Sequence, residues 1–144
     1  MTYKTFKQKA GALMWHIYGF LEETGYNTNH NADRIIIFEE NTESVYIKEW
    51  ANKLLNMLDS YCTWANYMQL PFKNVGKIRK LESGQYALDD NVLTCGTPLE
   101  VFMYDEETEQ EKWSYTTVEF NGKYYYFTCN GKKVKQGIFA RMKH

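Results

Sequence analysis

The side chains best suited to nucleophilic chemistry in this chain are its three cysteines and three histidines. A thiolate nucleophile needs a base close by, so the arrangement to consider is Cys95 or Cys129 with His16 or His30. Cys95 stands in a Thr-Cys-Gly segment and Cys129 precedes an Asn-Gly pair, where small residues ordinarily serve packing. The cysteines are odd in number and form no C-x-x-C pair, so the sequence predicts no catalytic thiol, no disulfide framework and no zinc site.

Other catalytic and ligand-binding motifs are also missing from the sequence. The chain contains no glycine-rich phosphate loop, no histidine-rich ligand set and no Asp-x-Asp calcium loop. The sequence therefore predicts neither a cofactor nor a metal, and it favours a protein that is not an enzyme.

Acidic residues are concentrated in one short segment after a predicted strand. They are Asp105, Glu106, Glu107, Glu109 and Glu111. Paired carboxylates can act as general acid and base, but a hairpin tip with five acids and no histidine or aromatic residue is usually a solvated loop. The functional alternative is an acidic prong that occupies the basic nucleic-acid channel of another protein by mimicking phosphates.

A second candidate surface is basic and aromatic. Lysines and arginines two positions apart share a strand face, and exposed tyrosines near them would offer rings for stacking single-stranded bases. The residues concerned are Lys77, Arg79, Tyr124, Tyr126, Lys133, Lys135, Arg141 and Lys143. The structural alternative is that these are edge-strand lysines that prevent aggregation, and the net charge of −1 gives no general argument for nucleic acid.

The first half of the chain predicts two long amphipathic helices. Apolar residues recur every three or four positions from about residue 2 to residue 24, and Gly25 ends this helix. Residues 41–44 offer three suitable N-caps for a second helix that reaches about residue 68. The β-branched residues 34–39 between them predict a strand, with a helix as the alternative.

The apolar period changes near Pro71, which divides the chain. We predict a helical subdomain over residues 1–70, a linker over 71–75 and an antiparallel β subdomain over 76–144. The predicted fold class is α+β, with an N-terminal helical hairpin packed on a small C-terminal antiparallel sheet or SH3-like barrel.

Turn signals in the β part predict hairpins. Asn121-Gly122 and Asn130-Gly131 each predict a tight two-residue turn, because both central residues of such a turn need φ > 0. The strands are expected over residues 113–120, 123–129 and 132–141, the last bent at a glycine. Alternation predicts a core face with Leu99, Val101, Met103, Ile138, Ala140 and Met142.

Length and composition agree with a folded protein. At 144 residues the chain can bury a core without disulfides, and 17% aromatic with 24% charged residues excludes a disordered class. The basic N-terminus leads into an amphipathic segment, not an apolar signal core, so the sequence predicts a protein of the reducing cytosol without a membrane span.

Short motifs in the second half resemble a known family. They are Gly84-Gln-Tyr-Ala-Leu, Leu93-Thr-Cys-Gly, Leu99-Glu-Val, a lone Trp113, Tyr124-Tyr-Tyr and Gly137-Ile-Phe-Ala-Arg. Their order is similar to that of a small β domain of unknown function that is common in proteins of Firmicutes conjugative elements, plasmids and prophages. The resemblance leaves residues 1–70 outside it and brings no catalytic residues.

The resemblance implies a mobile-element origin and a bacterial host. Small two-part proteins of that origin include inhibitors of host defence, among them anti-CRISPR proteins, and factors that handle the element's own DNA. We therefore expect a non-enzymatic binding protein that inhibits a CRISPR-associated or other defence nuclease by protein–protein contact, using the acidic run. The alternative is a nucleic-acid-binding accessory module that uses the basic residues.

Overall fold

The computed structural model describes residues 1–30 and 42–144 and divides into two compact units, Met1–Leu70 and Pro71–His144. The segment 34–39, predicted as a strand, lies outside the described residues. Residues 71–75, predicted as a linker, include the first residues of strand β1. That the helical hairpin packs on the sheet stays a prediction, and each unit is described by itself.

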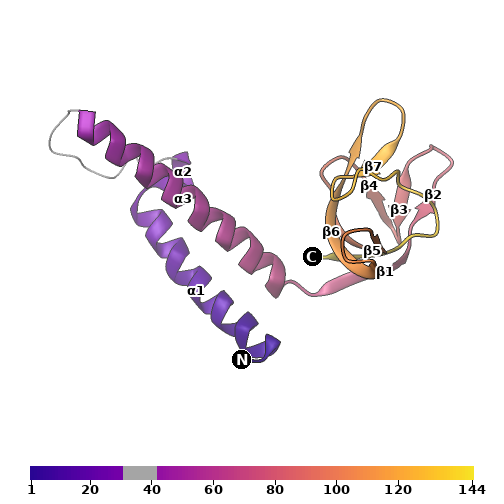
Figure 1. Cartoon of the computed structure of the whole chain (residues 1–144), viewed down its shortest axis with the longest axis horizontal. Helices are drawn as coiled ribbons and strands as arrows, with labels where there is room; N and C mark the ends of the chain where they lie inside the picture. Colours follow the sequence, from indigo (N-terminus) through magenta and orange to yellow (C-terminus); the bar gives the residue numbers. More distant parts are fainter. Residues whose placement is uncertain (31–41) are drawn as a thin grey trace. The chain divides into compact units, whose positions relative to one another are not determined.

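The helical unit consists of two long helices and one short one (Figure 1). Helix α1 spans Tyr3–Glu23, the single-turn α2 spans Tyr26–Asn29, and α3 spans Thr42–Gln69. The two long helices match their predicted bounds closely. Gly25 adopts a left-handed φ of 78° directly after α1, as its place at the helix end requires.

Helices α1 and α3 are antiparallel and share an apolar core. The Gln69 side chain donates to the Lys7 carbonyl at 2.9 Å, and the Tyr61 hydroxyl donates to the Ala10 carbonyl at 3.1 Å. The buried cluster of the helical unit consists of Met14, Ile17, Leu21, Tyr26, Leu55, Cys62 and Ala65. One face of each long helix is thus covered by the other, which confirms the helical hairpin.

The β unit contains two antiparallel sheets. The first has the strand order β1-β8-β5-β6-β7, formed by Phe72–Lys77, Phe139–Lys143, Pro98–Asp105, Gln110–Phe120 and Tyr125–Phe127. The second has the order β2-β3-β4, formed by Arg79–Lys80, Tyr86–Leu88 and Asn91–Leu93. The sheets do not close into a barrel, because β1 and β7 remain at the two edges. The α+β class is confirmed. Of the two predicted forms of the β part, an antiparallel sheet or an SH3-like barrel, the structure shows antiparallel sheets.

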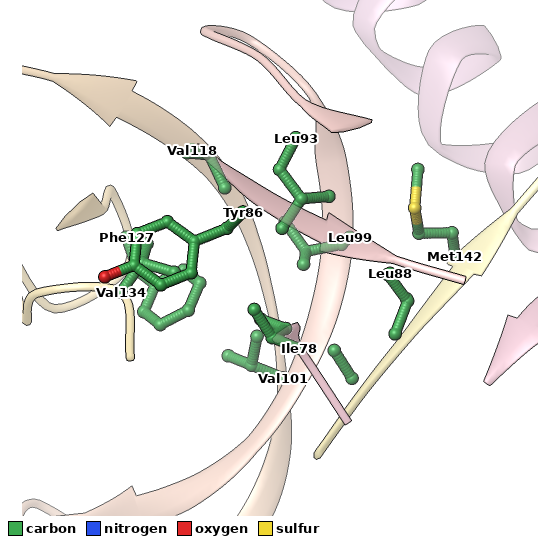
Figure 2. Close-up of a cluster of buried hydrophobic side chains, with 11 residues drawn as sticks. Ile78, Tyr86, Leu88, Leu93, Leu99, Val101, Val118, Phe127, Val134 and Met142 are labelled. Carbon is green, nitrogen blue, oxygen red and sulfur yellow. The ribbon is translucent and has the colours of Figure 1, made fainter. Parts of the chain in front are cut away.

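Both sheets contribute to the core of the β unit, shown in Figure 2. The buried cluster consists of Ile78, Tyr86, Leu88, Leu93, Leu99, Val101, Val118, Phe127, Val134, Ala140 and Met142. The predicted core face of β5 and β8 is therefore confirmed, with Met103 packed at its margin. Burial of these side chains is the main driving force for folding of this unit.

The turn at Asn121-Gly122 differs from its prediction. Strand pairing ends at Phe120 and Tyr125, and only Gly122 has a positive φ, 91°. The Asn121 side-chain oxygen accepts the backbone N–H groups of residues 123 and 124, both at 3.0 Å. The predicted tight turn is wrong because the asparagine stabilises a longer loop through its side chain.

The strand predicted over residues 132–141 is also wrong for most of its length. This segment pairs with β7 only at the single bridge between Tyr126 and Lys133. The N–H of Gly137, whose φ is 93°, donates to the carbonyl of Ile78 at 2.8 Å, which attaches the segment to the junction of β1 and β2. The chain consequently bends at the predicted glycine, and β8 pairs with β1 and β5.

Within the two described stretches of chain, no helix is both long enough and apolar enough to cross a membrane.

Candidate interaction surfaces of the β unit

The acidic run forms the turn between β5 and β6, and we call residues 105–111 the acidic hairpin. Asp105 ends β5, and its Oδ1 accepts the N–H groups of Glu107 at 2.8 Å and Thr108 at 3.0 Å. Glu109 closes the turn with a left-handed φ of 53°. The shape of this tip is therefore fixed by an aspartate side chain, since no glycine stands in the turn.

Asp105 also contacts a lysine. Lys112 Nζ pairs with Asp105 Oδ2, and this contact together with the two backbone N–H bonds lowers the pKa of Asp105 to about 2. The carboxylate is therefore charged throughout the physiological range. Its role in the structure is to stabilise the turn, which separates it from the other acids of the run.

We expect Asp105 to make the stability of the β unit depend on pH between about 4 and 2. The pKa in the folded protein lies below the ordinary value of 3.8, so the carboxylate stabilises the fold above that pH, and the stabilisation is lost as pH falls through about 2. Urea unfolding should show Asp105→Asn less stable than the wild type at pH 7 and nearly equal to it near pH 2. A stability difference that stays constant over this range would contradict this role.

The glutamates of the acidic hairpin face solvent. Glu106 Oε1 lies 3.4 Å from Lys132 Nζ across a hollow of about 310 Å³ between the hairpin and the 129–132 segment. Glu107, Glu109 and Glu111 are exposed, and no ion pair is found for them among residues 1–30 and 42–144. Four of the five predicted acidic residues are thus exposed to solvent, and one of these four, Glu106, also pairs with Lys132.

The outer surface of the five-stranded sheet carries rings that are not among the predicted site residues. We call this surface the aromatic face, and it consists of Phe72, Phe102, Trp113, Tyr115 and Phe139. The Trp113 ring contacts two neighbours, with its centroid 5.4 Å from that of Phe102 and 5.7 Å from that of Phe139. These three residues are paired across β6, β5 and β8. Both phenylalanines remain about 40% exposed, so the rings form a surface and are not a second core.

The aromatic face continues into the acidic hairpin. Beyond the pair of Phe102 and Trp113, the next outward pair along β5 and β6 is Tyr104 with Glu111. Because side chains two residues apart share a strand face, the rings and the carboxylates form one continuous surface. The same alternation rule that predicts Leu99 in the core would have found Phe102 on this surface.

Arg141, a predicted nucleic-acid contact, is held inside this surface. Its guanidinium carbon lies 4.1 Å from the centroid of Phe72 and 4.0 Å from that of Trp113. Its Nε and one terminal nitrogen each lie 2.6 Å from Glu100 Oε2. A guanidinium between two rings and bonded to a carboxylate stabilises the sheet, and the role of Arg141 as a nucleic-acid contact stays a prediction. Lys143 lies over Phe72 as well, at 4.8 Å.

The structure separates Lys77 from Arg79. Lys77 belongs to β1 and Arg79 to β2, and these strands belong to different sheets. The predicted shared strand face is therefore wrong for this pair, because the chain changes sheet at buried Ile78. The Arg79 guanidinium donates to the Asp89 carbonyl at 3.1 Å.

Lys133 belongs to a small hollow of about 120 Å³ that we call the basic hollow. Its lining consists of Lys80, Gly84, Tyr86, Phe120, Lys123, Tyr124, Tyr125 and Lys133. Lys133 Nζ lies 5.4 Å from the centroid of Tyr124. Two of the predicted residues, Tyr126 and Lys135, are not part of its lining. Lys80 and Lys123 are not among the predicted contacts, because neither has a second basic residue two positions away in the sequence.

The cysteines and histidines weighed as a nucleophilic pair belong to different units: Cys95 and Cys129 to the β unit, His16 and His30 to the helical unit. Cys62 is a buried free thiol of the helical unit, and burial, with a smaller effect of Asp59, raises its pKa. Cys95 and Cys129 are exposed free thiols of the β unit. Across the described parts of the chain, no three His, Cys, Asp or Glu side chains converge as metal ligands would.

Residues 76–142 match the family model described as "Domain of unknown function (DUF5348)". The match covers most of the β unit, leaves the helical unit outside it, and carries no stated activity. No curated protein and no solved structure matches the chain. The resemblance drawn from the short motifs is thus confirmed for a β domain of unknown function, and the origin in mobile elements stays a prediction.

Proposed function

We propose that this is a non-enzymatic binding protein whose β unit recognises another protein through the aromatic face and the acidic hairpin. The observation that carries the proposal is the row of packed rings Phe102, Trp113 and Phe139, in which the two phenylalanines are exposed and Trp113 is half-buried. Aromatic and arginine residues dominate the energetic centres of protein interfaces. Here they are already fixed by contact with one another and with Arg141, so little side-chain entropy is lost on binding.

The charge beside the rings indicates the chemistry of the partner. Exposed carboxylates at Glu107, Glu109 and Glu111 are complementary to a groove lined with lysine and arginine. Nucleases have such grooves for their substrates, and the family resemblance supports the same partner class. We infer an inhibitor, encoded by a mobile element or phage, that acts on a CRISPR-associated or other defence nuclease by occupying this groove.

Two matched double variants test the proposal. Glu107→Gln with Glu109→Gln removes two charges from the hairpin tip, while Glu82→Gln with Asp90→Asn removes two exposed charges elsewhere in the β unit. In DNA-cleavage assays with a panel of guided nucleases, we expect the wild type and the second variant to protect DNA equally. The tip variant should need roughly tenfold more protein, because charge complementarity with the groove is lost.

Asp105 is left unchanged in both variants because it holds the turn. Protection should also weaken as salt rises, since attraction between opposite charges is screened. Equal protection by the two double variants would refute the role of the acidic hairpin. A wild type that protects DNA from none of the nucleases would refute the proposed partner class.

A second candidate function, direct binding of nucleic acid, is favoured by the basic hollow. Lys80, Lys123 and Lys133 line this hollow together with Tyr124, and lysines beside aromatic rings are the combination that single-strand-binding surfaces use for phosphates and bases. If this function is correct, Lys123→Ala with Lys133→Ala should weaken binding to single-stranded DNA and flatten its dependence on salt.

A further inference from the structure

The helical unit carries an exposed apolar surface that the proposed function does not use. It has one stripe on α1 and one on α3, and we call the two together the apolar helical face. Its residues are Phe6, Leu13, Phe20, Trp50, Leu54, Met57 and Trp64. Their exposed fractions lie between 45% and 70%, whereas side chains between the two helices are nearly all buried. Contiguous apolar surface of this kind marks an interaction site.

Both stripes lie on the same side of the hairpin. An α-helix has about 3.6 residues per turn, so the angle between two sets of residues around its axis follows from their numbers. Around the axis of α1, the stripe lies about 70° from the buried residues of α1. Around the axis of α3, the stripe lies about 100° from the buried residues of α3, in the same sense of rotation. Because the helices are antiparallel, rotation in the same sense places both stripes on one broad face of the hairpin. Gln8 and Asn66 are exposed polar residues away from this face.

The spacing of the stripes indicates what covers them. Phe6, Leu13 and Phe20 are seven residues apart on α1, and Trp50, Met57 and Trp64 repeat this spacing on α3. A seven-residue repeat is the pattern of helices that pack lengthwise against other helices. The face therefore fits a partner that is itself helical and runs along the hairpin.

A second copy of this chain has the required surface. Large apolar side chains bury about 150–250 Å² each, so seven that are half exposed offer roughly 700 Å² per hairpin. A standard protein interface buries about 800 Å² on each partner. We propose that two copies pack their apolar helical faces together about a two-fold axis and form a four-helix bundle. This inference does not rest on the proposed function of the β unit.

The mass of the full chain in solution tests the inference, measured by size exclusion with light scattering. We expect a dimer of twice 17.1 kDa. Leu13→Glu with Leu54→Glu should convert it to a monomer, raising the dimer dissociation constant by about a hundredfold or more, because carboxylates would be buried without partners. The control is Gln8→Glu with Asn66→Glu, which adds the same charge away from the face and should leave the dimer intact.

A milder double variant separates loss of the dimer from unfolding of the helices. Leu13→Ala with Leu54→Ala keeps good helix formers and should retain the helical circular dichroism while weakening the dimer by about tenfold or more. A wild type that stays monomeric would overturn the inference, whether the face is then covered by the chain's own β unit or by another protein. A dimer of unchanged affinity in both leucine variants would overturn it as well.

Discussion

Phe127→Ala is expected to reduce the unfolding free energy of the β unit by about 3–5 kcal/mol, the range for truncating a buried phenylalanine. The Phe127 side chain is fully buried in the core cluster between the two sheets (Figure 2). Its removal leaves a cavity that the flanking strands cannot close. Urea unfolding followed by fluorescence would measure the loss in a background with Trp15, Trp50 and Trp64 changed to Phe, which leaves Trp113 of the β unit as the single tryptophan.

The control for this variant is Tyr124→Ala, three residues away, whose ring is exposed. Tyr124→Ala should reduce the unfolding free energy by only about 1 kcal/mol, because more than a third of this residue already faces solvent in the folded protein. Because the helical unit has a core of its own, we expect its circular dichroism signal to persist when Phe127→Ala has unfolded the β unit. Equal effects of the two substitutions would contradict the described core.

Arg141→Ala is expected to reduce the unfolding free energy of the β unit by about 2 kcal/mol and to leave the binding of nucleic acid unchanged. The side chain loses contact with two rings, and the mostly buried carboxylate of Glu100 loses this cation. Thermal or urea unfolding would measure the change. Arg141→Lys should recover only part of the stability, because an ammonium group cannot stack flat between rings. Unchanged stability together with weaker binding to naked DNA would instead make Arg141 a phosphate contact.

The sequence predicts the elements that depend on local periodicity. A repeat of three to four residues was sufficient for α1 and α3, and alternation was sufficient for the core face of β5 and β8. The turns are harder to predict from the sequence, because an asparagine before glycine is compatible with two different structures. Asn121 either adopts a positive φ in a tight turn or accepts backbone N–H groups with its side chain, and the composition is the same in both cases.

The candidate site shows a similar division. The acidic residues were found from their concentration, but the separate role of Asp105 depends on bonds that only the folded turn reveals. The aromatic face depends on the pairing of β8 with β5, which brings Phe139 and Arg141 beside Trp113. Pairing between strands so far apart in the chain is decided by burial across the whole unit, and no local pattern determines it.

A gel-shift titration of the wild-type protein against single- and double-stranded DNA and RNA, at low and at physiological salt, tests the central claim most directly. We expect no shift at physiological salt, because the exposed rings adjoin the glutamates of the acidic hairpin, which repel phosphate, and Arg141 is engaged with Glu100. The same preparation should protect DNA from a guided nuclease in proportion to its concentration. Tight, salt-sensitive binding to any of the four nucleic acids would contradict the claim and assign the function to the basic hollow.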